Sequence, residues 1–368
     1  MLSNFLLLFI STSASYLLPK PPGKYNVTLT TGPLIDYTRD DPNAPTPTPR
    51  ALMLSIFQPT KCAPIVPVPA MPDNVAEYQS QFLQQTFNIS ADFTFLFLDA
   101  RLPVCSDHTN RCLFQHDDFP ILLFSTAFSI PRFYYNVLAS AIASQGFTVI
   151  TIDHPYDANI LLYPDGHAVF TNYSIMNNAS WNYYPRAADA SFVIDQLSNA
   201  TAMAELIPGR GPKPFLTDRV AMLGHSAGGA SAILAASLDS RIRAAINWDG
   251  TIFGSPPLDM SQPVLFMDHD NQPMAPDWLE AWPQLKGPKM WVRVTNTTHQ
   301  TFSDMPVLLQ AAGVSAAPFA GVLGTIEAEE MMKILVAYTT TWMNAALTGK
   351  RQEPGNFLEV SALMKENF

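Results

Sequence analysis

The chain has 368 residues, of which 48% are hydrophobic and 14% are charged, and its formal net charge is -10. This length and apolar content are enough to bury one large core. An acidic chain without a basic stripe is a poor partner for nucleic acid. No apolar run reaches the ~18 residues that a membrane span needs. We therefore expect one domain with decorations over residues 16–368.

The first residues resemble a secretory signal peptide. Phe5–Ile10 is a short apolar run, and the small residues of 11–15 offer a cleavage site, although no basic residue precedes the run. A buried N-terminal strand is the alternative. Secretion is favoured by six N-x-S/T sequons, which make a glycoprotein the expectation. The sequon asparagines are Asn26, Asn88, Asn172, Asn178, Asn199 and Asn296. We expect residues 1–15 to be removed and the protein to be secreted.

Residues 17–118 combine proline-rich segments with a few regular patterns. An alternating run from 25 to 37 predicts an N-terminal strand within the proline-rich region 17–50, and Leu52–Phe57 predicts the next strand. An amphipathic helix is expected near Ala76–Phe87. Residues 61–118 as a whole should fold over one edge of the sheet.

Three cysteines remain after removal of the signal peptide: Cys62, Cys105 and Cys112. In an oxidising compartment Cys105 and Cys112 are expected to close a small disulfide loop, with pairing of Cys62 to either as the alternative. With His108 and His116 the last two also resemble zinc ligands, but a second Cys-x-x-Cys is missing. We expect no metal and no organic cofactor.

From residue 119 onward, buried strands alternate with helices. This pattern predicts a mostly parallel sheet with right-handed crossovers and helices on both faces. The expected strands are Phe119–Phe124, Phe147–Ile152, Arg219–Leu223, Ile242–Asn247, Val264–Met267 and Met290–Val294, and the expected helices are Tyr134–Ser144, Ala187–Leu197, Gly229–Ala236 and Glu327–Leu347. An insert at 155–185 contains the turn Tyr163–Gly166, which predicts a hairpin near the edge where such sheets bind ligands.

The segment Gly224-His225-Ser226-Ala227-Gly228 lies between one of these strands and a helix rich in small residues. Strand, G-x-S-x-G and helix, in that order, form the nucleophile elbow of an α/β-hydrolase, which is the fold class we predict. The serine must stand on a strained turn, where a side chain at either glycine would collide with its surroundings. The Ala227 amide, at the helix start, then faces the site of a developing oxyanion. An ordinary glycine-rich turn is the alternative.

A serine nucleophile needs a histidine base and an orienting carboxylate, in the chain order serine, acid, histidine for this fold. Two histidines follow Ser226. His299 lies in a polar loop beyond the last parallel strand, whereas His269 ends an earlier strand. We predict His299 as the base.

The acid is either Asp249, or Asp268 or Asp270 at the end of the following strand. Fold logic alone favours the later strand.

Four segments resemble the platelet-activating-factor acetylhydrolase family, in the branch related to the plasma enzyme. They are Pro120–Ser125, His225–Gly229, Asn247–Gly250 and Thr298–Phe302, which occur in the family's order and spacing between residues 119 and 305. The resemblance implies Asp249 as the acid and the Phe128 amide as the second oxyanion donor. The chain departs from the family at 126–129, where Thr-Ala-Phe-Ser replaces the usual His-Gly-x-Gly.

The resemblance also implies a substrate, a phospholipid with a short or oxidised acyl chain at the middle glycerol carbon. A lipid surface is a further candidate partner. The alternatives are a broader secreted esterase for polyesters or plant esters, similar to dienelactone hydrolases, and a non-catalytic binding protein on a hydrolase scaffold. We expect Ile160–Tyr163, with Trp181, Tyr183 and Tyr184, to wall the pocket and Phe128 to limit its depth, so that short acyl esters are preferred.

Overall fold

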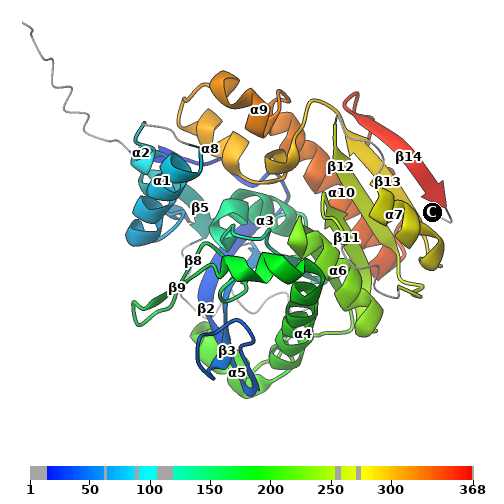
Figure 1. Ribbon diagram of the computed structural model, residues 1–368, viewed down its shortest axis with the longest axis horizontal. Helices are drawn as coiled ribbons and strands as arrows, with labels where there is room; N and C mark the ends of the chain where they lie inside the picture. The colour runs from blue at the N-terminus through cyan, green and yellow to red at the C-terminus, as the bar shows by residue number, and fades with distance from the viewer. Residues whose placement is uncertain are drawn as a thin grey trace, which may run out of the picture.

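The computed structural model describes residues 15–61, 64–87, 91–105, 119–252, 258–270 and 275–366. Its centre is a nine-stranded sheet of order β14-β13-β12-β11-β10-β6-β7-β3-β2 (Figure 1). The strands are β2 (Asn26–Asp40), β3 (Pro49–Thr60), β6 (Ile121–Ser125), β7 (Thr148–Asp153), β10 (Val220–His225), β11 (Ile242–Trp248), β12 (Val264–His269), β13 (Lys289–Val294) and β14 (Val360–Glu366).

The six central strands of this sheet run parallel, from β7 and β6 through β10, β11, β12 and β13. The outer strands β2, β3 and β14 are antiparallel to their neighbours. Because parallel strands end at the same edge, the residues that follow β10, β11, β12 and β13 come together there. The predicted α/β-hydrolase fold class, with its mostly parallel sheet, is confirmed.

Helices cover both faces of the sheet (Figure 1). Ala221 and Leu223 of β10 belong to the core shared with α3 (Asn136–Ala143) and α10 (Ala328–Thr348). The alternate residues Val220 and Met222 belong to the core shared with helices α4 and α6. These two helices are α4 (Ala179–Leu197) and α6 (Ala227–Leu238). The strand is therefore buried on both faces, which is why its sequence is continuously apolar.

The start of α4 differs from the prediction. The helix begins at Ala179 rather than at Ala187, and it runs through Pro185. A proline removes its own amide donor and its ring crowds the carbonyl four residues earlier. At the seventh residue both effects fall on the first two turns, and the turns after Pro185 keep their hydrogen-bond donors.

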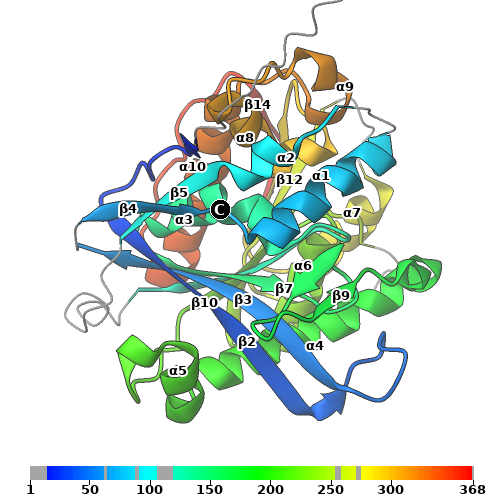
Figure 2. The ribbon, with the colours of Figure 1, turned by 90° about the vertical axis from the view of Figure 1, so that its left-hand side faces the viewer.

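A smaller three-stranded sheet of order β1-β5-β4 lies beside the edge strand β2 (Figure 2). Its strands are β1 (Tyr16–Leu17), β4 (Ile65–Pro69) and β5 (Ala100–Cys105), accompanied by α1 (Asp73–Phe87) and α2 (Thr94–Leu98). This is the placement expected for 61–118, as far as those residues are described. Cys105 is buried and forms no disulfide with another described residue. Cys62, Cys112 and both histidines of the zinc alternative lie outside the described residues, so the disulfide remains a prediction.

The insert forms the predicted hairpin from β8 (Ile160–Leu162) and β9 (Ala168–Phe170), which pair antiparallel. The remaining helices are α5 (Ala200–Leu206), α7 (Pro276–Ala281), α8 (Met305–Ala311) and α9 (Ala320–Leu323). Within the described segments no helix combines the length and apolar character needed to cross a bilayer. Asn199 and Asn296 are exposed sequon residues, whereas Asn88 and residues 1–14 fall outside the described part.

Candidate active site

Ser226 stands on a sharp turn between β10 and α6. Its φ of 56° and ψ of -126° belong to a region that residues other than glycine rarely adopt. A Cβ on Gly224 would overlap the backbone of Gly228, and a Cβ on Gly228 would overlap the backbone of Ser125. The two glycines of the motif are therefore required for the turn. The Ser226 amide donates to the Trp248 carbonyl at 2.8 Å, which fixes the serine beside the end of β11.

Backbone strain is concentrated at this edge of the sheet. Each of the five non-glycine residues with positive φ in the described chain follows the carboxyl end of a central strand. They are Ser129 after β6, Tyr156 after β7, Ser226 after β10, Asp249 after β11 and Asn296 after β13. Such residues cost about 1–3 kcal/mol each and persist where the surrounding structure enforces them, most often at functional sites.

Asp249 and His299 meet at the same edge. His299 Nδ1 lies 2.5 Å from Asp249 Oδ2. Because a carboxylate can only accept, Nδ1 carries the hydrogen and Nε2 is left with its lone pair. The Asp249 side chain is 4% exposed and that of His299 is 38% exposed, so the base faces solvent while the acid is covered. The Asn247 side chain holds Gly250, the residue that follows the acid. It accepts from the Gly250 amide and donates to the Gly250 carbonyl, both at 2.8 Å.

His269 contacts the same carboxylate, which the sequence analysis did not foresee. Its Nδ1 lies 2.6 Å from Asp249 Oδ2, and its backbone amide lies 3.2 Å from Oδ1. Burial alone would raise the pKa of Asp249, but the hydrogen bonds from His269 and His299 outweigh it and hold that pKa well below its usual range. The strand order could have predicted this contact. Because β12 lies between β11 and β13, its last residue, His269, lies between Asp249 after β11 and His299 after β13.

The later carboxylates have other partners. Asp268 forms an ion pair with Arg293. Asp270 Oδ2 accepts from the Asn296 amide at 3.1 Å, at the base of the loop that carries His299. The structure therefore brings Asp249, rather than either of these, to the imidazole of His299.

Phe128 lies in the loop after β6, and the backbone amides of the residues before and after it both donate hydrogen bonds. The Ala127 amide donates to Tyr135 Oη at 3.3 Å, and the Ser129 amide donates to the Asp157 carbonyl at 2.9 Å. The Phe128 amide has no hydrogen-bond partner among the described residues. This loop is thus fixed without glycine, and it leaves one donor available.

The Ala227 amide is the second available donor. Ala227 is the first residue of α6, and within the described chain its amide has no hydrogen-bond partner. The first amides of a helix, together with the helix dipole, favour a negative charge at this position.

A buried chain of hydrogen bonds joins the Phe128 loop to the His299 loop. His225 Nε2 lies 3.0 Å from the His299 carbonyl, which can only accept, so this nitrogen carries the hydrogen. His225 Nδ1 is then the acceptor for Tyr135 Oη at 2.9 Å, and the same Oη accepts from Ala127. Burial, together with His299, lowers the pKa of His225 to about 3, so the relay uses a neutral imidazole.

The segment Ile160–Tyr163, expected to wall the pocket, is divided between two hydrophobic clusters. Leu161 and Tyr163 are buried in a separate cluster with Met53 and Ala158, and Ile160 belongs to the main core. The alternation of the short hairpin places Leu161 and Tyr163 against β3 and places Ile160 and Leu162 against the main core, so a pocket wall formed by this segment stays a prediction.

Other aromatic residues of the insert lie closer to the site. Tyr173 packs edge-on against Phe128, with ring centroids 6.1 Å apart. Tyr183 is buried and donates to the Thr251 carbonyl at 2.8 Å, two residues after the acid. Tyr184 is exposed, and the side chain of Trp181 lies outside the described part.

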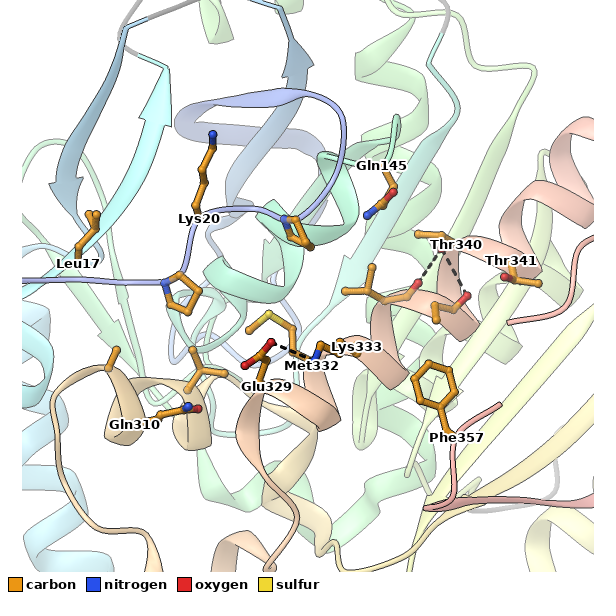
Figure 3. A pocket seen from close by; sticks show the side chains of 16 residues that line it. Leu17, Lys20, Gln145, Gln310, Glu329, Met332, Lys333, Thr340, Thr341 and Phe357 are labelled. Carbon is orange, nitrogen blue, oxygen red and sulfur yellow. Dashed lines mark hydrogen bonds and ion pairs between the residues drawn. The ribbon is translucent and has the colours of Figure 1, made fainter. Parts of the chain in front are cut away.

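A cavity of about 820 Å³ lies elsewhere, between α10, α8 and the N-terminal segment (Figure 3). Met332 and Val336 of α10 line it, and the ion pair of Glu329 with Lys333 lies beside them. None of its lining residues belongs to the predicted site.

Comparisons with known proteins place the chain among esterases. The sequence model of a family described as "Platelet-activating factor acetylhydrolase, isoform II" matches residues 13–196 and 214–356. A "Probable 1-alkyl-2-acetylglycerophosphocholine esterase" of Arthroderma benhamiae is 29% identical, over 92% of this chain and 90% of the relative. A "Platelet-activating factor acetylhydrolase" of Canis lupus familiaris is 23% identical, over 61% of this chain and 56% of its own length.

Among solved structures, a ferulic acid esterase from Streptomyces cinnamoneus superposes with a TM-score of 0.75 and 25% identity. The match covers 95% of this chain and 100% of that one. The family resemblance drawn from the four motifs is confirmed.

Proposed function

Because this chain belongs to the platelet-activating-factor acetylhydrolase family, we propose that it is a secreted serine esterase that hydrolyses short-acyl phospholipid esters. The proposed catalytic triad is Ser226, Asp249 and His299. The observation that carries the proposal is the hydrogen bond between His299 Nδ1 and Asp249, because it leaves the Nε2 lone pair available as a base at the sheet edge that also carries the strained, half-buried Ser226.

In the first step His299 Nε2 takes the proton of Ser226 as the hydroxyl oxygen attacks the ester carbonyl carbon. Asp249 holds the imidazole in the required tautomer and stabilises the imidazolium. The imidazolium then protonates the departing alcohol, which leaves an acyl group on the serine. Water attacks this acyl-enzyme with His299 again as the base, and the carboxylic acid is released.

The Ala227 and Phe128 amides are the proposed donors to the oxyanion of each tetrahedral intermediate. Both amides are without partners among the described residues and both follow carboxyl ends of neighbouring strands, β10 and β6. Preorganised amides of this kind stabilise the charge that develops in the transition state more than the neutral ester.

The proposed substrate is a choline phospholipid with an acetyl or other short acyl group, the chemistry that the name of the Arthroderma relative describes. The Phe128 ring and Tyr173 pack together beside one oxyanion donor and would limit the space for a long acyl chain. A broader esterase activity is the second candidate, because the ferulic acid esterase shares the fold over almost the whole chain.

An acyl-length series on the purified protein tests the substrate. We expect acetyl and other short esters to exceed long-chain esters by at least about tenfold in kcat/KM, with Ser226→Ala as the blank. Equal or faster turnover of long-chain phospholipids would contradict the short pocket. Inert acetylated phospholipids together with cleavage of polyesters or ferulate esters would favour the second candidate.

Secretion is part of the same proposal and has its own test. We expect the mature protein in the medium of a eukaryotic host to begin after the apolar segment at 5–10 and to lose mass on treatment with an N-glycosidase. Retention inside the cell with the N-terminus intact would contradict this part while leaving the esterase unaffected.

A further inference from the structure

The Asp249 carboxylate contacts one imidazole more than a catalytic triad uses. We propose that Asp249, His269 and His299 together form a binding site for a divalent transition-metal ion such as Zn²⁺, and that the bound ion switches the esterase off. The inference rests on the proposed function for its inhibitory part, whereas the binding part stands on the geometry alone.

The three side chains are the ligand types that zinc and copper prefer. Two imidazole nitrogens and one carboxylate oxygen form a common zinc-binding set, with the fourth position left to water. Their ligand atoms, one from each residue, all lie within 4.8 Å of one another. They come from the ends of three adjacent strands or the loops that follow, β11, β12 and β13 (Figure 1), so the backbone already holds them together.

The distances show what must move. Each Nδ1 lies 2.5–2.6 Å from Asp249 Oδ2, a spacing that accommodates a hydrogen. Around a tetrahedral zinc with bonds of ~2.0–2.1 Å, neighbouring ligand atoms lie roughly 3.3 Å apart. The ion therefore needs each imidazole to retreat by less than about 1 Å, a small rotation for a side chain. The side chains of His269 and His299 are 22% and 38% exposed, which gives the ion an entry path.

Binding would disable the base by exchanging its tautomer. The ion occupies the Nδ1 lone pair of His299, and the hydrogen that Nδ1 carried is relocated to Nε2 through solvent. The imidazole stays neutral, so no proton is gained or lost overall. With a hydrogen on Nε2, His299 cannot accept the proton of Ser226, and the first step of ester cleavage stops.

The chain offers a matched control in the hairpin insert. His167 Nδ1 lies 2.6 Å from Asp165 Oδ1, and both side chains are largely exposed. This pair copies one histidine–aspartate contact of the site but lacks the second imidazole. A generic effect of surface histidines would be altered by His167→Ala, whereas an effect of the three-ligand site would not.

Binding is measured first, by isothermal titration of zinc chloride into the full chain carrying Ser226→Ala, which retains all three ligands. We expect one zinc per chain with micromolar affinity. Adding His269→Gln, which keeps a donor for Asp249 but removes the nitrogen ligand, should weaken binding at least tenfold. His167→Ala should leave it unchanged. Equal affinity with and without His269 would overturn the site.

Activity is measured second, on the chain with Ser226 intact and a soluble acetyl ester. We expect zinc to inhibit, a chelator to restore the rate, and His269→Gln to need at least tenfold more zinc relative to its own uninhibited rate. Zinc that binds without inhibiting would overturn the switch. A chain that binds zinc through His269 yet hydrolyses no ester would contradict the proposed function instead, and an active esterase that ignores zinc would contradict only this inference.

Discussion

Two sets of serine, histidine and aspartate lie in this protein. In each, a histidine Nδ1 contacts an aspartate oxygen, but the surroundings are opposite. The outer set is Ser226, His299 and Asp249, at the carboxyl edge of the sheet. The inner set is Ser125, His154 and Asp189. His154 Nε2 lies 2.9 Å from Ser125 Oγ, and Nδ1 lies 2.7 Å from Asp189 Oδ2. All three inner side chains are fully buried.

Two arginines donate hydrogen bonds to the inner set. Arg50 donates to both oxygens of Asp189, at 2.7 and 2.6 Å, and Arg186 Nη1 donates to Ser125 Oγ at 3.1 Å. Burial alone would raise the pKa of Asp189, but Arg50 and His154 hold it far below its usual range, while burial lowers the pKa of His154. Every polar group therefore has a partner and no substrate can approach.

The comparison teaches which features make such a set reactive. Ser125 lies within the regular strand β6, whereas Ser226 stands on a strained turn. The Ala227 and Phe128 amides, which follow β10 and β6, have no hydrogen-bond partner among the described residues. The side chain of the outer base is 38% exposed, and that of the inner one is fully buried. Hydrogen bonds among a serine, a histidine and an aspartate do not by themselves identify a catalytic triad. Solvent access to the histidine, backbone strain at the serine and available oxyanion donors identify it.

The largest expected difference separates the two serines. Ser226→Ala should lower kcat/KM for an acetyl ester by roughly 10³–10⁶-fold without unfolding the chain, because the nucleophile is gone. Ser125→Ala removes one buried hydroxyl that takes no part in the proposed ester chemistry and should lower kcat/KM by less than about tenfold. Steady-state rates and circular dichroism of both variants decide this. Comparable losses of kcat/KM in the two variants would show that the inner serine also contributes to catalysis.

The next prediction separates the outer acid from its neighbour in sequence. Asp249→Asn should cost roughly 10²–10⁴-fold in rate, since an amide can present a donor to Nδ1 and impose the wrong tautomer on His299. Asp270→Asn should cost less than about tenfold, because Asp270 accepts from the Asn296 amide and an amide oxygen can still do so. The reverse ranking would move the acid to the later strand.

The inner acid should matter for stability. Asp189→Asn leaves the Arg50 guanidinium buried with less opposing charge, which should lower the free energy of unfolding by about 3 kcal/mol. Asp249→Asn removes no buried partner for an arginine and should cost less. Urea unfolding of the two variants tests the ranking. A wild-type unfolding midpoint for Asp189→Asn would show that the inner set contributes nothing to folding.

The sequence was sufficient for the features that depend on local pattern. Continuous apolar runs identified strands of the central sheet, such as 119–124, and the spacing of glycines around Ser226 identified the elbow. The motif order of the family singled out Asp249 over the later carboxylates. Each of these is written within a few neighbouring residues or in the chain order of motifs, so no knowledge of contacts was required.

Features that depend on distant contacts could not be predicted. His269 reaches Asp249 only because β12 lies between β11 and β13, and the inner set joins residues 29 to 64 positions apart. The edge strand β14 was also missed, since Val360–Glu366 gains main-chain pairing with β13 but alternates only weakly in burial. The division of the hairpin side chains between two clusters could not be predicted for the same reason.

The smallest predicted effect concerns the link between the two loops of the outer set. Tyr135→Phe keeps the buried ring but removes the hydroxyl that accepts from Ala127 and donates to His225. The Phe128 amide and the His299 backbone then lose their common tie, and the oxyanion should be stabilised less while the ester itself binds as before. We expect kcat to fall about tenfold with KM nearly unchanged, and a phosphonate analogue of the tetrahedral intermediate to react correspondingly more slowly. A rise in KM with unchanged kcat would instead assign Tyr135 to substrate binding, and the relay would have no part in holding the oxyanion donors.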